Sequence, residues 1–169
     1  MLFRSIWWVD GNHEERLTRA IWRHAQGFSF LVRDIPEALR LDELAAGFVP
    51  YGKHIEYLGF VLTHGNFVSA YSAYTAKRHM ERYRSSGANG HTHRLGSYSV
   101  TDMHGRSHTW YEQGALCRKD LDYVRGVANW QQGFLIGTVA GGALHPQLVH
   151  VIETEAGRGF YAGGKYYSI

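Results

Sequence analysis

The sequence contains one cysteine, Cys117, among its 169 residues. A single thiol excludes an internal disulfide framework and a cysteine-rich zinc site, and it is typical of a reducing compartment. Long apolar runs are also missing, since none approaches the roughly 20 residues that a membrane-crossing helix requires. The stretch before Asp10 is too short for a signal peptide. These absences predict a cytoplasmic protein without a membrane partner.

The excess of positive charge is small. Lysine and arginine number 18 against 15 aspartates and glutamates, and the isoelectric point is near 9.0. That balance suits an anionic partner but is too weak to identify one. With 44% hydrophobic and 20% charged residues the composition is globular, and the length is that of one domain. We therefore treat residues 1–169 as a single domain.

Histidine is the abundant residue of chemical interest, with 11 copies. Imidazole is both the commonest metal ligand and the usual acid or base near neutral pH. The positions of the histidines relative to the expected strands and helices therefore decide what they can do.

The first part of the chain alternates between strand and helix patterns. Leu2–Val9 is a short apolar run typical of a strand, a loop follows it, and helical spacing extends from His13 to about Gln26. Residues 36–47 predict a second helix, with proline at its start and glycine at its end. Residues 55–62 predict another strand, and Val68–Tyr83 carries a long helical stripe.

The second part of the chain favours β-structure. Short segments punctuated by turns follow Gly90, and three glycine-rich positions predict hairpin turns between strands. These turns are Gly141-Gly142, Gly157–Gly159 and Gly163-Gly164, and the strands between them include Leu148–Glu153 and Phe160-Tyr161.

Polar clusters follow three of the predicted strand ends. Because ligands gather where loops leave the carboxyl ends of strands, we expect Asn12, His64, His91 and His93 to converge. Neutral imidazoles and an amide oxygen suit Zn, Mn or Fe. An extended segment at His91-Thr92-His93 would place two imidazoles on one side. Taken singly, Asn12 is more typical of a turn between a strand and a helix, and His64 is more typical of an ordinary loop histidine.

The three clusters together resemble the last three motifs of the calcineurin-like metallophosphoesterases. The matching segments are Gly11-Asn12-His13-Glu14, His64-Gly65 and Gly90-His91-Thr92-His93-Arg94, in that order. A softer similarity, to a subgroup common in phage genomes, comes from residues 66–77 and 129–134. The resemblance implies an α/β fold, the αββα sandwich of two mixed sheets with helices outside, with its N-terminal strands missing from this chain.

The resemblance also implies roles for particular residues. Asn12, His64 and His91 would bind the second divalent ion of a binuclear Mn, Zn or Fe site, and His93 would bind the first. His13 would lie near the substrate phosphate as the catalytic residue, donating a proton to the leaving oxygen or stabilising the transition state.

One departure from the family concerns carboxylates. Family members begin with Asp-x-His and Gly-Asp-x-x-Asp, and this sequence starts just before the third motif. Imidazoles alone cannot complete a two-metal clamp, so we expect a complementing N-terminal chain to supply the carboxylates. Asp10 is the only carboxylate just before Asn12, and we expect it to cap the helix that follows rather than to replace the bridging aspartate.

These observations predict a metal-dependent phosphoesterase that hydrolyses phosphomonoesters or phosphodiesters, with nucleic acid as one candidate substrate. A first alternative is a non-catalytic remnant that binds a metal or a phosphorylated ligand. A second alternative is a nucleic-acid-binding accessory protein that uses a basic helix face. The residues of that face are Lys77, Arg78, Arg82 and Arg84.

Overall fold

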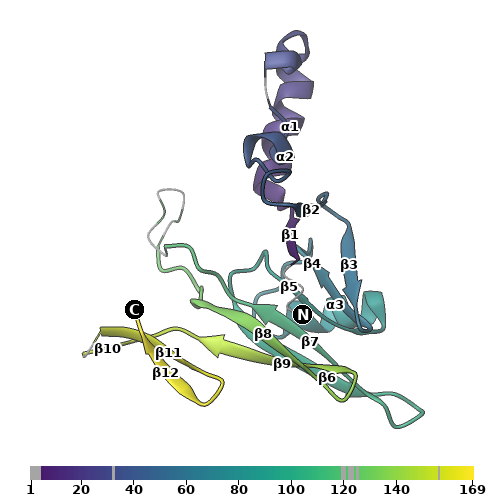
Figure 1. Cartoon of the computed structure of the whole chain (residues 1–169), viewed down its shortest axis with the longest axis vertical. Helices are drawn as coiled ribbons and strands as arrows, with labels where there is room; N and C mark the ends of the chain where they lie inside the picture. The colour runs from purple at the N-terminus through teal and green to yellow at the C-terminus, as the bar shows by residue number, and fades with distance from the viewer. Residues whose placement is uncertain (1–4, 32, 119–120, 122–123, 125, 156) are drawn as a thin grey trace. The chain divides into compact units, whose positions relative to one another are not determined.

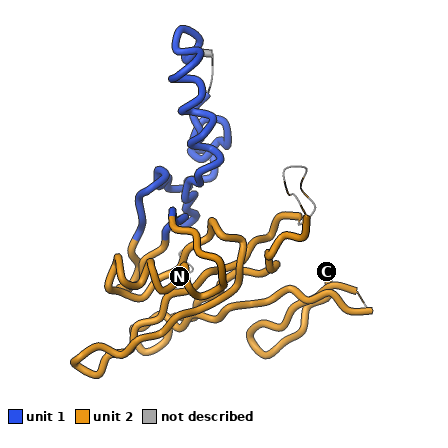
Figure 2. The backbone as a smooth tube through the Cα atoms, turned by 180° about the vertical axis from the view of Figure 1, so that it is seen from behind, with its two compact units in different colours: residues 1–55, 63–66 blue, residues 56–62, 67–169 orange. Residues whose placement is uncertain are grey.

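The computed structural model describes residues 5–31, 33–118, 121, 124, 126–155 and 157–169. The chain forms two compact units, one of residues 1–55 and 63–66 and the other of residues 56–62 and 67–169 (Figure 2). Both helices and strands are present, and the strands belong to several separate sheets (Figure 1). The mixed α/β class is confirmed, whereas the αββα sandwich stays a prediction.

The first unit is built on a parallel pair of strands, β1 (Ile6–Val9) and β2 (Ala46–Val49). Parallel neighbours require a long crossover, and helices provide it here. Gly47 of β2 lies against the ring of Trp7, where a Cβ atom would collide with the indole. The crossover consists of α1 (Asn12–His24), the 3₁₀ helix η1 (Gln26–Leu31) and α2 (Ile35–Ala38).

The helix predicted over residues 36–47 is confirmed only at its start, and its predicted length is wrong. Asp34 caps α2 by accepting a hydrogen bond from the backbone N–H of Glu37 at 2.8 Å, but the helix ends at Ala38. Arg40 and Ala45 then adopt positive φ, which a helix cannot accommodate. The strand predicted over Leu2–Val9 is confirmed from Ile6 onward, and its first three residues lie outside the described part of the chain.

Helix α1 has a clear apolar side that the described residues leave uncovered. None of its residues is buried, and Leu17 and Trp22 are 55% and 58% exposed. Amphipathic helices normally bury their apolar side against a neighbouring layer. In the described part of the first unit, η1 contacts α1 but leaves Leu17 and Trp22 exposed.

A five-stranded sheet has the order β3-β4-β5-β7-β6, and most of its residues belong to the second unit. β5 and β7 are parallel, whereas β6 and β7 are antiparallel. The single strand predicted over residues 55–62 is wrong, because Leu58 and Gly59, both with positive φ, turn the chain between β3 and β4. The strands are β3 (His54–Tyr57), β4 (Phe60–Thr63), β5 (Ser86–Asn89), β6 (Leu95–Thr101) and β7 (Ser107–Gln113).

Helix α3 (Tyr74–Tyr83) packs on β5, β6 and β7. It is shorter than the stripe from Val68 predicted, because Ala73 has positive φ and only the following residues are helical. Ala76 and Met80 of α3 form a buried core with Val61 of β4 and Trp110 of β7.

The C-terminal region is β-structure, as the sequence predicts. The hairpin turns at Gly141-Gly142 and Gly163-Gly164 are confirmed, whereas Gly157–Gly159 lies in a strand rather than a turn. The predicted strand Leu148–Glu153 is split at Val151 between two strands. The strands are β8 (Gly133–Ala140), β9 (Ala143–His150), β10 (Ile152–Thr154), β11 (Gly157–Ala162) and β12 (Lys165–Ser168). In the described part of the chain, every helix is too short or too polar to span a bilayer.

Candidate metal centre

All three predicted clusters follow strands, as expected. Asn12 is the first residue of α1 and comes shortly after β1. His64 directly follows β4, and Gly90 directly follows β5. The structure thus places each motif at the end of a strand, in a loop or at the start of a helix.

Asn12 and His64 are brought together although 52 positions separate them. His64 Nε2 and Asn12 Oδ1 lie 3.0 Å apart, within hydrogen-bond distance, and the ring of Tyr51 contacts the His64 ring edge-on with centroids 5.9 Å apart. Gly11 is required here, because a Cβ atom on it would lie 2.9 Å from His64 Cε1. The first unit therefore holds two of the predicted ligands with their polar atoms facing each other.

The Asn12–His64 spacing fits a shared divalent ion. Two ligand atoms about 2.1 Å from one ion lie about 3.4 Å apart in tetrahedral geometry and about 3 Å apart in octahedral geometry, and Oδ1 and Nε2 are 3.0 Å apart. The amide oxygen and imidazole nitrogen are also the atoms that borderline divalent metals accept. An ion bound by both residues would replace the direct contact between their side chains.

His91 and His93 lie in a strained loop of the second unit. Both have positive φ, 60° and 57°, and the Thr92 N–H donates to the Gly90 carbonyl at 2.6 Å. That bond makes His91 the centre of a three-residue γ-turn of the rare, positive-φ kind. The extended segment expected at His91-Thr92-His93 is therefore wrong, because a turn replaces it. Positive φ at neighbouring non-glycine residues is a feature of functional sites.

The segment at residues 129–134 supports this loop. The ring of Trp130 meets that of His93 edge-on, with centroids 4.4 Å apart. The Gln131 N–H donates to the His93 carbonyl at 2.9 Å, and Gln131 Oε1 accepts from the Leu95 N–H at 3.2 Å. Arg94 Nη1 donates to the carbonyl of Ser69. Residues of the two segments noted in the sequence, 66–77 and 129–134, thus contact the histidine loop or its immediate neighbours.

Two further residues near Asn12 have a bearing on chemistry. His13 is exposed in the first turn of α1, which keeps it accessible for its predicted catalytic role. Asp10 is only 6% exposed and does not cap α1, because the N-cap is Gly11 and has no side-chain cap. The predicted capping role of Asp10 is wrong. Burial raises the pKa of the Asp10 carboxyl, although the Trp8 indole N–H donates to it at 3.4 Å.

The four predicted ligands fall into two pairs in different units, so the convergence of all four stays a prediction. Within the described ranges, no three or more histidine, cysteine, aspartate or glutamate side chains are grouped to hold an ion.

The basic face of α3 is partly engaged in structural contacts. Lys77 pairs with Glu81 at 3.8 Å. Arg78 lies over the ring of Phe67, 4.5 Å from its centroid, and donates to the Val68 carbonyl at 3.0 Å. Two of the four basic side chains, Lys77 and Arg78, are therefore engaged in contacts within the chain.

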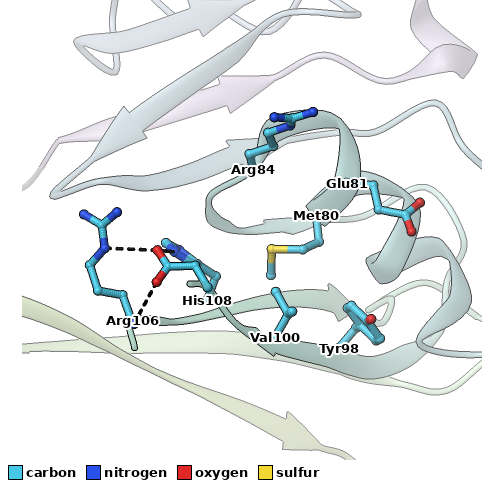
Figure 3. A pocket seen from close by; sticks show the side chains of 8 residues that line it. Met80, Glu81, Arg84, Tyr98, Val100, Arg106 and His108 are labelled. Carbon is cyan, nitrogen blue, oxygen red and sulfur yellow. Dashed lines mark hydrogen bonds and ion pairs between the residues drawn. The ribbon is translucent and has the colours of Figure 1, made fainter. Parts of the chain in front are cut away.

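A pocket of about 750 Å³ opens between the end of α3 and the β6–β7 hairpin (Figure 3). Met80, Tyr98 and Val100 provide its apolar surface, and two guanidinium groups lie at its rim. They belong to Arg84, at the C-cap of α3, and to Arg106, in the hairpin. The sequence patterns did not indicate this pocket, because its residues come from separate elements.

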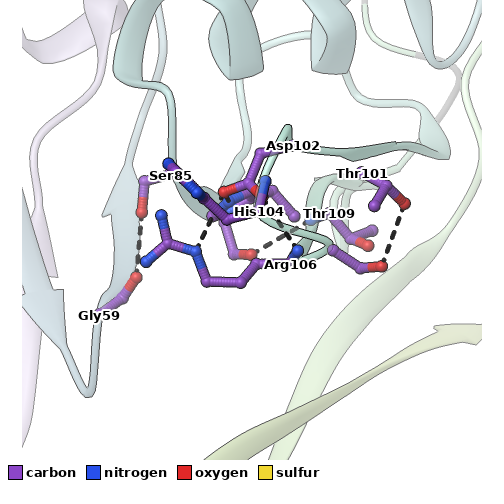
Figure 4. Close-up of polar contacts among 10 residues, drawn as sticks. Gly59, Ser85, Thr101, Asp102, His104, Arg106 and Thr109 are labelled. Carbon is purple, nitrogen blue, oxygen red and sulfur yellow. Dashed lines mark hydrogen bonds and ion pairs between the residues drawn. The ribbon is translucent and has the colours of Figure 1, made fainter.

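Asp102 organises the hairpin beside that pocket (Figure 4). Its Oδ1 accepts from the backbone N–H groups of His104 and Arg106, both at 2.9 Å. Its Oδ2 accepts from Arg106 Nε at 3.0 Å and His108 Nε2 at 3.3 Å. The Arg106 backbone bond is the largest cause holding the pKa of Asp102 well below its usual value. Asp102-Met103-His104 has the letters of Asp-x-His, but here the aspartate holds a turn.

The comparisons with known proteins are sparse. No family model and no solved structure matches the chain. Two relatives are the "Gene 54 protein" of Mycobacterium phage D29 and that of Mycobacterium phage L5. Each is 35% identical over 159 residues, an alignment that covers 85% of this chain and 60% of the relative. The chain therefore matches about 60% of the length of these relatives.

Proposed function

We propose that this chain contributes the imidazole and amide ligands of a binuclear metal centre that hydrolyses phosphoesters. The observation that carries the proposal is the Asn12–His64 contact of 3.0 Å, which joins two motifs distant in sequence with their ligand atoms facing each other. The strained His91–His93 loop after β5 provides the second pair. Divalent ions at such a centre stabilise charge on the phosphoryl group and activate water. His13 donates the proton to the leaving oxygen.

A second polypeptide segment supplies the carboxylates in this proposal. Two features of the first unit support it. β1 and β2 form a two-stranded parallel sheet, whereas parallel strands normally lie inside larger, covered sheets. The apolar side of α1 is exposed. Additional strands bearing Asp-x-His and Gly-Asp-x-x-Asp would extend that sheet and complete the metal ligands.

The test is complementation. The chain is mixed with a polypeptide that carries both carboxylate motifs, and Mn²⁺-dependent cleavage of bis-p-nitrophenyl phosphate is measured. We expect activity from the mixture and little from either part. His13→Ala lowers the rate about 10²-fold or more while metal content is kept, as for loss of a general acid. His91→Ala lowers both metal content and rate, and His150→Ala is the control. Full activity of the chain alone would contradict the proposal.

The pocket beside α3 favours a second candidate, binding of a phosphorylated ligand without catalysis. Arg106 is engaged with Asp102 through Nε, and Figure 3 shows Arg106 among the side chains that line the pocket. Guanidinium groups suit phosphate oxygens. Titration with a mononucleotide should shift the NMR signals of Tyr98 and His108. Arg84→Gln should weaken the effect and Arg23→Gln, in α1, should not. Equal shifts in both variants would dismiss this candidate.

A further inference from the structure

Glu112 is a fully buried carboxylate in the middle of the second unit. It lies on β7 with 0% exposure, two residues after Trp110, so strand alternation directs both side chains to the same face of the sheet. Carboxylates are almost never fully buried unless their oxygens have partners. The partners of Glu112 therefore indicate why it is there.

One oxygen of Glu112 caps helix α3. Oε1 accepts from the backbone N–H of Ala76 at 3.0 Å, in the first turn of the helix. The N-cap residue, Ala73, has no side-chain cap of its own. A carboxylate at this end satisfies one of the first N–H groups and interacts favourably with the helix dipole. Glu112 thus takes the place of a local capping residue.

The other oxygen of Glu112 holds the histidine loop. Oε2 accepts from the hydroxyl of Thr92 at 2.9 Å, and Thr92 is 6% exposed between the partly exposed His91 and His93. The flanking histidines both have positive φ. A backbone in that conformation persists only when its surroundings fix it. The hydrogen bond from Thr92 to Glu112 fixes the residue between the two histidines.

Asn89 fixes the start of the same loop. It is fully buried, its Nδ2 donates to the Gly90 carbonyl at 2.8 Å, and its Oδ1 accepts from Trp110 Nε1 at 2.9 Å. Two sets of hydrogen bonds thereby connect the loop to β7. Asn89 links Gly90 to Trp110, and Thr92 bonds directly to Glu112. Of these two, the Thr92–Glu112 bond involves the residue between the two histidines.

We propose that Glu112 is a positioning residue for His91 and His93, acting through the Thr92 hydroxyl. The effect of this positioning on metal affinity rests on the proposed function. The hydrogen bonds that hold the loop do not depend on that function. Residues that orient metal ligands typically alter metal affinity 10- to 100-fold when they are removed. Glu112 is expected to act in that range.

The Thr92→Val variant separates positioning from helix capping. It removes the hydroxyl that reaches Glu112 and leaves the Ala76 bond to the carboxylate in place. Thr92→Ser keeps the hydroxyl and should behave as the wild type. Thr109→Val is the matched control, because the Thr109 hydroxyl also has a hydrogen-bond partner, Ser99 Oγ at 2.8 Å, but on the exposed β6–β7 face.

The readout is the NMR signals of the His91 and His93 imidazoles in the full chain, first without metal and then during Zn²⁺ titration. We expect Thr92→Val to shift both metal-free signals and to lower the Zn²⁺ affinity read at these rings about tenfold. Glu112→Gln should displace the same signals, and adding Thr92→Val to it should change them little further. Thr92→Ser and Thr109→Val should leave them unchanged.

Metal-free signals that remain as in the wild type in Thr92→Val would overturn the positioning role, whether or not Glu112→Gln folds. Absence of a Zn²⁺ response in the wild type would instead contradict the proposed metal centre. In that case the metal-free signals still decide the role of Glu112.

Discussion

Replacement of His79 by phenylalanine should remove much of the acid sensitivity of the second unit. His79 is 1% exposed, and its ring is stacked on Trp110 with centroids 5.2 Å apart and an interplanar angle of 8°. Neither ring nitrogen has a hydrogen-bond partner among the described residues. Burial, followed by the charges of His91 and Arg78, lowers the pKa of His79 from 6.5 to about 4.

The sign and size of the effect follow from proton linkage. Between about pH 6.5 and 4 the unfolded chain binds a proton at His79 that the folded chain does not, so stability falls as the pH falls. Each pKa unit is worth about 1.4 kcal/mol, so the wild type loses up to about 3 kcal/mol from this residue on acidification to pH 4.5. Phenylalanine keeps an aromatic ring in the stack and does not titrate.

Urea unfolding at pH 7.5 and pH 4.5 measures the effect. The stability of His79→Phe relative to wild type should rise by about 3 kcal/mol at the lower pH. His150→Gln, which replaces an exposed histidine, is the control and should show a much smaller change. If the unfolding free energies of His79→Phe and wild type differ by the same amount at both pH values, the argument is refuted. His79 would then have the same pKa in the folded and the unfolded chain.

Two further predictions concern packing and metal affinity. Gly87→Ala should destabilise the second unit by about 1–3 kcal/mol in urea unfolding, because the new Cβ would lie 2.6 Å from both Trp110 Cζ3 and the Val61 carbonyl; an unchanged midpoint would count against this packing. The chain alone should bind Mn²⁺ or Zn²⁺ weakly, since neutral ligands leave the charge of the ion uncompensated. Tight, stoichiometric binding in calorimetry at neutral pH would show that carboxylates of this chain complete the centre.

The sequence located the candidate ligands better than it described their surroundings. Apolar runs ending in polar residues correctly placed Asn12 and His64 after strands. The strand before His91, β5, has the sequence Ser-Gly-Ala-Asn and no apolar run that would predict it. Local signals failed where distant contacts decide the structure. Gly47, which the sequence pattern assigned to a helix end, instead faces the ring of Trp7 in the β1–β2 pair. The turn at Leu58-Gly59 was missed inside an apolar run.

The conformation of the histidine loop could not be predicted from its own residues. The bond that anchors Thr92 comes from Glu112, 20 positions away, and the covering ring comes from Trp130. Alternation along β7 does place Glu112 on the same face as Trp110, and a charged residue at such a position is a usable signal. His79 lies in the helical stripe of residues 68–83, at the spacing of Ala76 and Met80, and that spacing is a local sign that it faces the core.

The convergence of the two ligand pairs is tested most directly by adding small amounts of Mn²⁺ to the full chain and recording the histidine NMR signals. Paramagnetic broadening reports which rings lie close to the ion. We predict that His64, His91 and His93 broaden together, that the exposed His145 and His150 remain sharp, and that His91→Gln reduces the broadening of His64. Broadening of His64 that is independent of His91, or confined to one pair, would contradict a shared metal centre.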